Sequence, residues 1–338
     1  MAYNSGMIDF SESYRLFGFE ALRQRVAALT AQVPAVRAND DIEAVHQMRV
    51  ASRRLRAALA LFGEALTDKH ADDWQREIKR ITKALGAARD TDVQFDWLKS
   101  FLAQTTDAAC LPGINRLLLR LYQQRQRLQG KVIQTLDRLE ASHTLDDLAT
   151  TLREGVVVAR LNNVDAHAPD VYAHAAEAIR LRLEEFLAYD VFVSQPDRAT
   201  ELHAMRIAAK HLRYTLEIFA ELYADGLKKS IKTVKEIQEL LGDIHDCDVW
   251  VAYVPQFIAE EQARTLEYFG TTAAMKQLTP GLDALRADRK RYRDKRYRQF
   301  VEVWDNTVAE DVWGKLRQTI TRSENQITAE NAESAETS

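Results

Sequence analysis

AVHQMRVASRRLRAALALFGEAL (residues 44–66) decides the fold, because the chain repeats this stretch as ELHAMRIAAKHLRYTLEIFAELY at residues 201–223. The offset between the copies is 157 residues, and the same offset aligns ALRQRVAAL (21–29) with AIRLRLEEF (178–186). Similarity that keeps one register over such a distance indicates an internal duplication. We therefore predict two halves of one design.

The repeat continues toward the end of each half. An offset of 156 residues aligns REIKRITKALGAARDTDV (76–93) with KTVKEIQELLGDIHDCDV (232–249). The offset grows to 168 where Pro112-Gly113 falls on Pro280-Gly281, so the second copy carries about twelve extra residues before its last helix. The predicted organisation is a first half at 10–142, a connector at 143–167, a second half at 168–320 and a tail at 321–338.

The composition predicts an all-α protein. Among 338 residues only 12 are Gly and 6 are Pro, so most of the chain can propagate a helix. The first half has predicted breaks at Pro34, Asn39-Asp40-Asp41, Thr67-Asp68 and Pro112-Gly113, which separate helices near 12–33, 41–66, 70–104 and 112–140. Gly86 is expected to bend or interrupt the third helix, with Asp90 or Asp92 capping its continuation. Because short connections favour antiparallel neighbours, we predict two pseudo-symmetric four-helix bundles.

Charge is unevenly distributed along the chain. The formal net charge is −4, but the stretch from Ser323 to Ser338 holds four glutamates and no Lys or Arg, which predicts a disordered acidic C-terminal tail. Cys110 and Cys247 are too few for a disulfide framework or a four-thiolate metal site. Nothing resembles a signal peptide or a membrane-spanning apolar run, so we expect a cytoplasmic protein with no membrane contact.

The second helix of each half carries a strip of cationic side chains beside its apolar face. His46, Arg49, Arg53 and Arg56 follow one another at helical spacing, and the strip returns in the second copy as His203, Arg206, Lys210 and Arg213. Charged strips are usually solvated helix faces, and that alternative applies to any single copy. Nearby Arg54 has become His211, whereas cationic character at the four strip positions is kept. This conservation between copies favours a binding role.

Matched cations also occur on the other helices. The pairs are Arg23 and Arg25 with Arg180 and Arg182, Arg76 and Lys79 with Lys232 and Lys235, and Arg125 and Arg127 with Arg293 and Lys295. Arg125 lies within an apolar seam, where an unpaired charge would be unfavourable by several kcal/mol. Either an ion pair, for example with Asp90 or Asp92, or an anionic ligand would compensate it.

Converging Arg and Lys side chains suit a chain of phosphates. The guanidinium group donates paired hydrogen bonds to phosphate oxygens, and Lys supplies a mobile charge. Histidine adds a donor that titrates near pH 6.5, so binding is expected to strengthen at mildly acidic pH. The pairs Asp90/Asp92 and Asp246/Asp248 either orient these cations or cap helices, and they signal a Mg²⁺ site only weakly. The hypothesis is a linear polyanion as ligand, with no cofactor and no metal site.

Two pairs of motifs resemble the CHAD family, the conserved histidine α-helical domain. The first pair is H-x-x-R-V-x-x-R-R-L-R-x-x-L-x-x-F (46–62) and H-x-x-R-I-x-x-K-x-L-R-Y-x-x-E (203–217), and the second is LG-x-x-R-D-x-D-V (85–93) and LG-x-x-H-D-x-D-V (241–249). The resemblance covers about residues 10–320, and implies two helical bundles with a basic groove or pore that binds inorganic polyphosphate without catalysis. Arg89 stands where the second copy has His245, which is a departure from the shared pattern.

Two other functions remain as alternatives to polyphosphate binding. A metal-dependent phosphohydrolase would use His46, His203, His245 and the Asp pairs, but the sequence lacks an H-E-x-x-H motif, a Gly-rich phosphate loop and a nucleophile elbow. Nucleic-acid binding is disfavoured because aromatic residues are not interleaved with the cations of the second and third helices. The expected partner is inorganic polyphosphate, with association with polyphosphate granules as an extension of this hypothesis.

Overall fold

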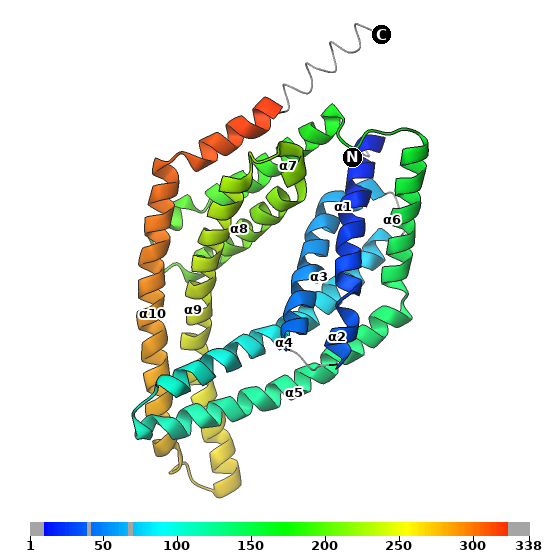
Figure 1. Cartoon of the computed structure of the whole chain (residues 1–338). Helices are drawn as coiled ribbons and strands as arrows, with labels where there is room; N and C mark the ends of the chain where they lie inside the picture. The colour runs from blue at the N-terminus through cyan, green and yellow to red at the C-terminus, as the bar shows by residue number, and fades with distance from the viewer. Residues whose placement is uncertain (1–9, 39–41, 67–69, 324–338) are drawn as a thin grey trace, which may run out of the picture.

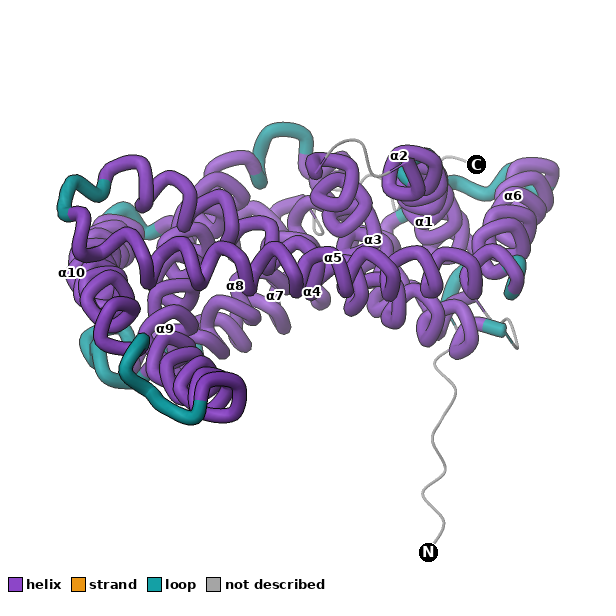
Figure 2. Tube along the Cα trace, turned by 90° about the horizontal axis from the view of Figure 1, so that it is seen from below, coloured by secondary structure: helices purple, strands orange, loops and turns teal. Residues whose placement is uncertain are grey.

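The computed structural model describes residues 10–38, 42–66 and 70–323. In this part of the chain every regular element is helical (Figures 1 and 2). The all-α prediction is therefore confirmed. No helix within these residues is long and apolar enough to span a bilayer.

The first half begins with helices close to the predicted ones. They are α1 (Glu12–Thr30), α2 (Val33–Ala38), α3 (Ile42–Phe62), α4 (Ala71–Gln104) and α5 (Leu111–Ala141), with the short 3₁₀ helices η1 (Gly63–Leu66) and η2 (Ala108–Cys110). Pro34 does not end a helix as predicted, because it lies in the first turn of α2, where its missing N–H would have no intrahelical partner. The breaks predicted at 39–41 and 67–68 lie outside the described residues.

The second half follows the same order. Its elements are α7 (Pro169–Leu187), η3 (Asp190–Phe192), α8 (Ala199–Phe219), η4 (Ala220–Tyr223), α9 (Lys228–Phe269), α10 (Met275–Ala309) and a last helix over 312–323. With 42 residues, α9 is longer than the 34-residue α4, and this extension contains most of the insertion inferred from the change of offset. Residues 321–323, placed in the tail by the sequence, belong to the last helix, and the rest of the predicted tail lies outside the described residues.

The predicted connector contains a helix of its own, α6 (Thr144–Leu161). It packs along α1, and its Leu148 and Leu152 are completely buried in the main core. At the offset of 168 residues, α6 aligns with the last helix at 312–323. The first bundle therefore has a fifth helix that the sequence pattern had assigned to a link between the halves.

Within each half, helices that follow one another in the chain pack together, and between the halves several helices pack on their repeat counterparts. α1, α3, α4 and α5 pack in succession, as do α7, α8, α9 and α10 (Figure 1). Across the halves, α1 contacts α7, α3 contacts α8 and α5 contacts α10. Figure 2 shows α5 running the length of the molecule toward α10. Each of these contacts joins a helix to its repeat counterpart.

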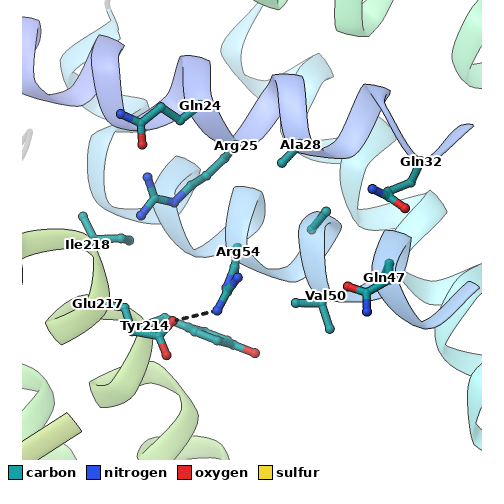
Figure 3. Close-up of a pocket in the computed structure, with 11 residues that line it drawn as sticks. Gln24, Arg25, Ala28, Gln32, Gln47, Val50, Arg54, Tyr214, Glu217 and Ile218 are labelled. Atoms are coloured by element: carbon teal, nitrogen blue, oxygen red, sulfur yellow. Dashed lines mark ion pairs between the residues drawn. The ribbon is translucent and has the colours of Figure 1, made fainter. Parts of the chain in front are cut away.

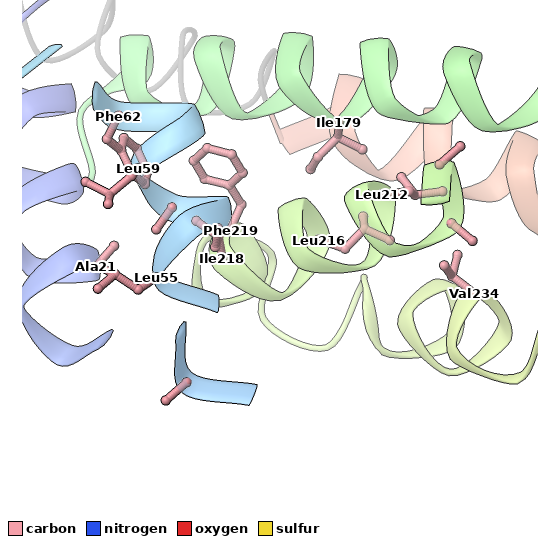
Figure 4. Packing of buried hydrophobic residues seen from close by; sticks show 14 of the residues in the cluster. Ala21, Leu55, Leu59, Phe62, Ile179, Leu212, Leu216, Ile218, Phe219 and Val234 are labelled. Carbon is pink, nitrogen blue, oxygen red and sulfur yellow. The ribbon is translucent and has the colours of Figure 1, made fainter. Parts of the chain in front are cut away.

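One apolar core spans both halves and fixes α3 against α8. Phe17 of α1 stacks on Phe219 of α8 at 5.6 Å between ring centres, and Phe62 of α3 meets the same ring edge-on at 5.9 Å. Figure 4 shows Phe62 and Phe219 together with Leu55, Leu59, Leu212 and Leu216. Burying large aromatic side chains is strongly stabilising, so the helix pair that carries the cationic strips has a rigid base.

A close crossing of α5 and α10 explains the matched Pro-Gly pairs. A Cβ added to Gly113 would overlap the backbone carbonyl of Leu278, and one added to Gly281 would overlap that of Cys110. Both glycines are buried, Gly113 in the first turn of α5 and Gly281 further inside α10. Pro112 does mark the first turn of α5, as predicted, whereas Pro280 lies inside α10. The glycines are thus required by backbone contact between the halves.

Gly86 does not interrupt its helix, because α4 runs unbroken from Ala71 to Gln104. Asp90 and Asp92 consequently cap nothing. Gly86 instead faces Arg49, whose Nε would lie 3.7 Å from an added Cβ, and Gly242 faces Arg206 in the same way at 3.5 Å. Both distances correspond to ordinary van der Waals contact, so the two glycines mark where the arginines of the cationic strips pack against α4 and α9.

Candidate functional site: a cationic groove between α3 and α8

The two cationic strips come together where α3 packs on α8. Arg49 and Arg53 of α3 and Arg206 and Lys210 of α8, here called the central cluster, are close enough to disfavour one another's charge. Burial lowers the pKa of Lys210 to about 7, and the charges of Arg206, Arg53 and Arg49 contribute to the decrease. The protonated form of a half-buried lysine is destabilised by neighbouring arginines, because like charges repel and burial removes water from the ammonium group.

The pKa values of two arginines beside Lys210, Arg53 and Arg206, are also lowered. Burial lowers the pKa of Arg53, Tyr214 opposes this, and Arg49 and Arg206 lower it further. Burial likewise lowers the pKa of Arg206, whose Nε is buried without a hydrogen-bond partner in the described part of the chain. The Arg53 guanidinium lies 5.7 Å from the centre of the Tyr214 ring, a cation–π distance.

Carboxylates compensate this charge only in part. Arg49 pairs with Asp90 at 3.2 Å, whereas Arg53, Arg56 and Lys210 form no ion pair among the described residues. Asp246 attracts both Arg206 and Lys210 electrostatically. It forms no ion pair with either of them in the described part of the structure. The groove therefore has an excess of positive charge that an anion would relieve.

Two histidines, His203 and His245, lie side by side at one end of the cluster, and both have lowered pKa values. The rings of His203 and His245 lie 3.9 Å apart. Burial lowers the pKa of His203, helped by Arg206, and burial with His203 lowers the pKa of His245 to about 4. Nδ1 of His46 and of His203 are buried without a partner in the described residues. Any strengthening of binding by protonation of His203 or His245 is thus shifted to a lower pH than an ordinary value of 6.5 would give.

Two cavities flank Tyr214 at the contact of α3 with α8. The first, about 230 Å³, is called the α7-side pocket, and its polar lining consists of Arg53, Arg56, Arg182, Lys210, His211, Tyr214 and Thr215. The second, about 420 Å³, is called the α1-side pocket (Figure 3), and its polar lining consists of Gln24, Arg25, Gln32, Gln47, Arg54, Tyr214 and Glu217. Together with the central cluster they form the cationic groove.

The structure brings some of the predicted cations of the first and second helices to this groove. Arg25 lines one pocket and Arg182 the other, and Arg213 lies 5.0 Å from the centre of the Tyr214 ring. The site also includes Tyr214 and His245, which were not among the predicted contacts. His245 could have been found from its motif position, whereas nothing in the sequence signals that Tyr214 separates two pockets.

Arg125 and Arg293 are held in ion pairs. Nε of Arg125 donates to Asp92 at 2.6 Å, and the Asp92 side chain is only 3% exposed. Arg293 pairs in the same way with Asp248 and also donates to the carbonyl oxygen of Pro196 at 2.8 Å. Of the two alternatives for Arg125, the structure contains the ion pair, and the equivalent pair in the second half ties α9 to α10.

The remaining predicted residues line neither pocket beside Tyr214. Arg23, Lys79, Arg127, Lys235 and Lys295 are exposed, and Arg180 is partly exposed. Lys235 lies 3.8 Å from Glu239, and Arg127 lines a separate cavity of about 490 Å³ with Arg120 and Arg264. Among the residues that the structure describes, no group of three or more His, Cys, Asp or Glu side chains is arranged to hold a metal ion.

The comparisons with known proteins agree with the family that the motifs indicate. The CHAD domain profile matches residues 20–255. The chain belongs to the CHAD domain family. Among solved structures, the CHAD domain from the plant Ricinus communis is similar, with a TM-score of 0.58 and 27% identity, and the match covers 83% of this chain and 92% of that one.

Other similar proteins share the CHAD fold or sequence over long stretches. PptA from Streptomyces chartreusis has a TM-score of 0.54 at 15% identity, over 87% of this chain and 99% of that one, which is a likeness of fold alone. Two uncharacterized proteins of Mycobacterium tuberculosis, from strains CDC 1551 and H37Rv, are 29% identical over 232 residues. The match covers 67% of this chain and 42% of each relative, so the chain spans less than half the length of these relatives.

Proposed function

We propose that this CHAD protein binds inorganic polyphosphate, without catalysis, in the cationic groove between α3 and α8. The observation that carries the proposal is the central cluster, in which Arg53, Arg206 and Lys210 are half-buried together with too few carboxylates. Such an arrangement is unfavourable in the free protein and becomes favourable when an anion enters. Family membership supports polyphosphate as that anion.

The chemistry of the cluster fits a flexible chain of phosphates better than a single small anion. Guanidinium groups from two helices face one groove, and each can donate two hydrogen bonds to phosphate oxygens. A long chain can contact both strips at once, because its second contact is intramolecular once the first has formed. We infer that the protein acts in the cytoplasm, where the same groove would target it to polyphosphate granules.

The alternatives receive less support from the groove. A phosphohydrolase would need a positioned nucleophile or metal beside the phosphates, and the polar groups around Lys210 are mainly cations. Single-stranded nucleic acid is usually held by stacked aromatic side chains as well as by charge, and Tyr214 is buried beneath Arg53 and Arg213. We therefore place both behind polyphosphate binding.

Two double variants test whether the strips form one site. Arg49→Ala with Arg53→Ala, and Arg206→Ala with Lys210→Ala, should each weaken binding of long-chain polyphosphate by about 3–6 kcal/mol, since each charge-assisted contact contributes about 1.5–3 kcal/mol. Lys131→Ala with Lys276→Ala removes two exposed cations that were not predicted contacts and serves as the charge-matched control. Calorimetry with polyphosphates of graded length gives affinity and stoichiometry together.

A shared groove predicts that both double variants keep the wild-type stoichiometry and lose affinity. Triphosphate should bind much more weakly than long chains, because it is too short to bridge the strips. Two independent sites would instead show half the number of bound chains and an unchanged remaining affinity. Equal binding of single-stranded DNA of matched charge would favour the nucleic-acid alternative, and release of phosphate with added Mg²⁺ or Mn²⁺ would favour the enzymatic one.

A further inference from the structure

The two pockets beside Tyr214 occupy equivalent positions in the repeat. At the offset of 157 residues, Arg25 of the α1-side pocket corresponds to Arg182 of the α7-side pocket, and Ile218 corresponds to Leu61. Tyr214 lines both cavities. The pockets are thus two versions of one cavity, one on each side of the place where α3 meets α8.

The two versions differ in charge at one position above all. Glu217 lines the α1-side pocket, and its repeat counterpart in the α7-side pocket is Ala60. The Glu217 carboxylate lies 3.6 Å from Arg54, as Figure 3 shows, and 3.4 Å from Arg213. One carboxylate therefore compensates the arginines of this pocket, and it is partly exposed to any ligand that enters.

The α7-side pocket has no such carboxylate in its lining. Arg53, Arg56 and Lys210 face it without an ion pair in the described part of the chain. Arg182 is held by Glu185 at 2.7 Å, but Glu185 is not one of the lining residues. Four cations thus stand against no acid in this cavity, whereas in the α1-side pocket two arginines stand against Glu217.

We propose that the cationic groove is one-sided: Glu217 keeps phosphate out of the α1-side pocket, and the bound chain runs from the central cluster into the α7-side pocket. This inference rests on the proposed function, because it assigns a direction to the polyanion in the same groove. Its physical basis is like-charge repulsion, since placing a phosphate beside a carboxylate in a partly buried pocket is unfavourable by several kcal/mol. Duplication supplied two equivalent pockets, and the Glu217/Ala60 difference selects one.

Arg54 and Arg56 provide an internal comparison for the test. Both are exposed on α3, two residues apart, yet Arg54 lines the α1-side pocket and Arg56 the α7-side pocket. Phenylglyoxal labels exposed guanidinium groups, and the extent of labelling at each arginine can be read by peptide mass spectrometry. With saturating long-chain polyphosphate on the full chain, labelling of Arg56 should fall at least about fivefold more than labelling of Arg54.

Substitutions at positions 60 and 217 should change which pocket the bound chain occupies. Ala60→Glu should weaken polyphosphate binding at least about tenfold, whereas Glu217→Ala should tighten it, because it removes the repelling carboxylate. The double variant with both changes should transfer the protection from Arg56 to Arg54. Ala287→Glu and Glu236→Ala make the same changes of charge on exposed positions of α10 and α9, and circular dichroism confirms that each variant is folded.

The results distinguish a failure of polyphosphate binding from a failure of the one-sided groove. If the wild-type protein neither binds polyphosphate nor shows protection of any arginine, the proposed function is wrong. If it binds, but Arg54 and Arg56 are protected equally or Ala60→Glu binds as tightly as Ala287→Glu, the groove is not one-sided while the proposed function stands. Protection confined to Arg54 would reverse the assignment and overturn it.

Discussion

For the proposed binding of polyphosphate, we expect Lys210 to cause a dependence on pH in a range where arginine sites show none. Its pKa in the free protein is lowered to about 7, so much of the side chain is neutral at pH 8. A bound polyanion favours the protonated amine and raises this pKa, so binding takes up a proton when the pH is above about 7. We expect affinity to fall as the pH rises from 7 to 9.

The size of the effect follows from the two pKa values. With a free pKa of about 7 and a bound pKa between about 8 and 10, linkage gives a loss of affinity of roughly 5- to 50-fold between pH 7 and pH 9. Arg53 and Arg206 stay charged throughout this range and contribute no slope. Of the histidines, His245 has a pKa of about 4 and also adds nothing above pH 7.

Lys210→Arg isolates the titration of this one amine. Arginine keeps the positive charge but does not deprotonate, so the variant should bind with nearly constant affinity from pH 7 to pH 9. Fluorescence anisotropy with end-labelled polyphosphate at fixed ionic strength measures both curves. An equal slope in the wild type and in Lys210→Arg would refute the assignment, as would a flat wild-type curve.

Three further predictions concern the scaffold and the charge of the groove. Gly113→Ala, or Gly281→Ala, should destabilise the protein by about 1–3 kcal/mol in chemical denaturation, although alanine favours a helix, because the added methyl group separates α5 from α10. Unchanged stability would contradict the close crossing. Asp92→Ala leaves Arg125 buried without its partner and should destabilise by about 3–5 kcal/mol, whereas no effect would show that water solvates the guanidinium group. Finally, polyphosphate affinity should decrease steeply and linearly on a log-log plot against salt concentration, and a flat dependence would exclude the electrostatic account.

Much of the fold could be predicted because helices leave a strong mark in sequence. The periodic apolar residues of α3 and α8, together with the repeat, predicted the helices that form the site and their equivalence. The prediction was weaker where a residue has more than one physical use. Gly86 is typical of a helix break, but here it lies inside the unbroken α4 and faces Arg49, and only the packing of α3 on α4 reveals this.

The sequence predicted cations of the candidate site, but it did not predict their positions relative to one another. Periodicity places Arg49 and Arg53 on one flank of a helix, but it does not say that Lys210 lies among them. Arg125 was ambiguous for the same reason, since an apolar seam around an arginine is compatible with a ligand or with a carboxylate from another helix. The Asp92 partner is 33 residues away, which is beyond the reach of a local pattern.

The free energy of the fold explains how such a groove persists without its ligand. Buried like charges on α3 and α8 oppose folding, and the Phe17, Phe62 and Phe219 contacts between the same elements favour it. Because the aromatic core holds the helices together, the cations cannot separate to relieve their repulsion. The cations of the groove are thus held close together in the free protein. Under the proposed function, a polyanion that enters relieves their repulsion, and this relief favours binding. The formal net charge of −4 does not oppose this, since attraction in a partly buried groove depends on nearby charges more than on the sum over the chain.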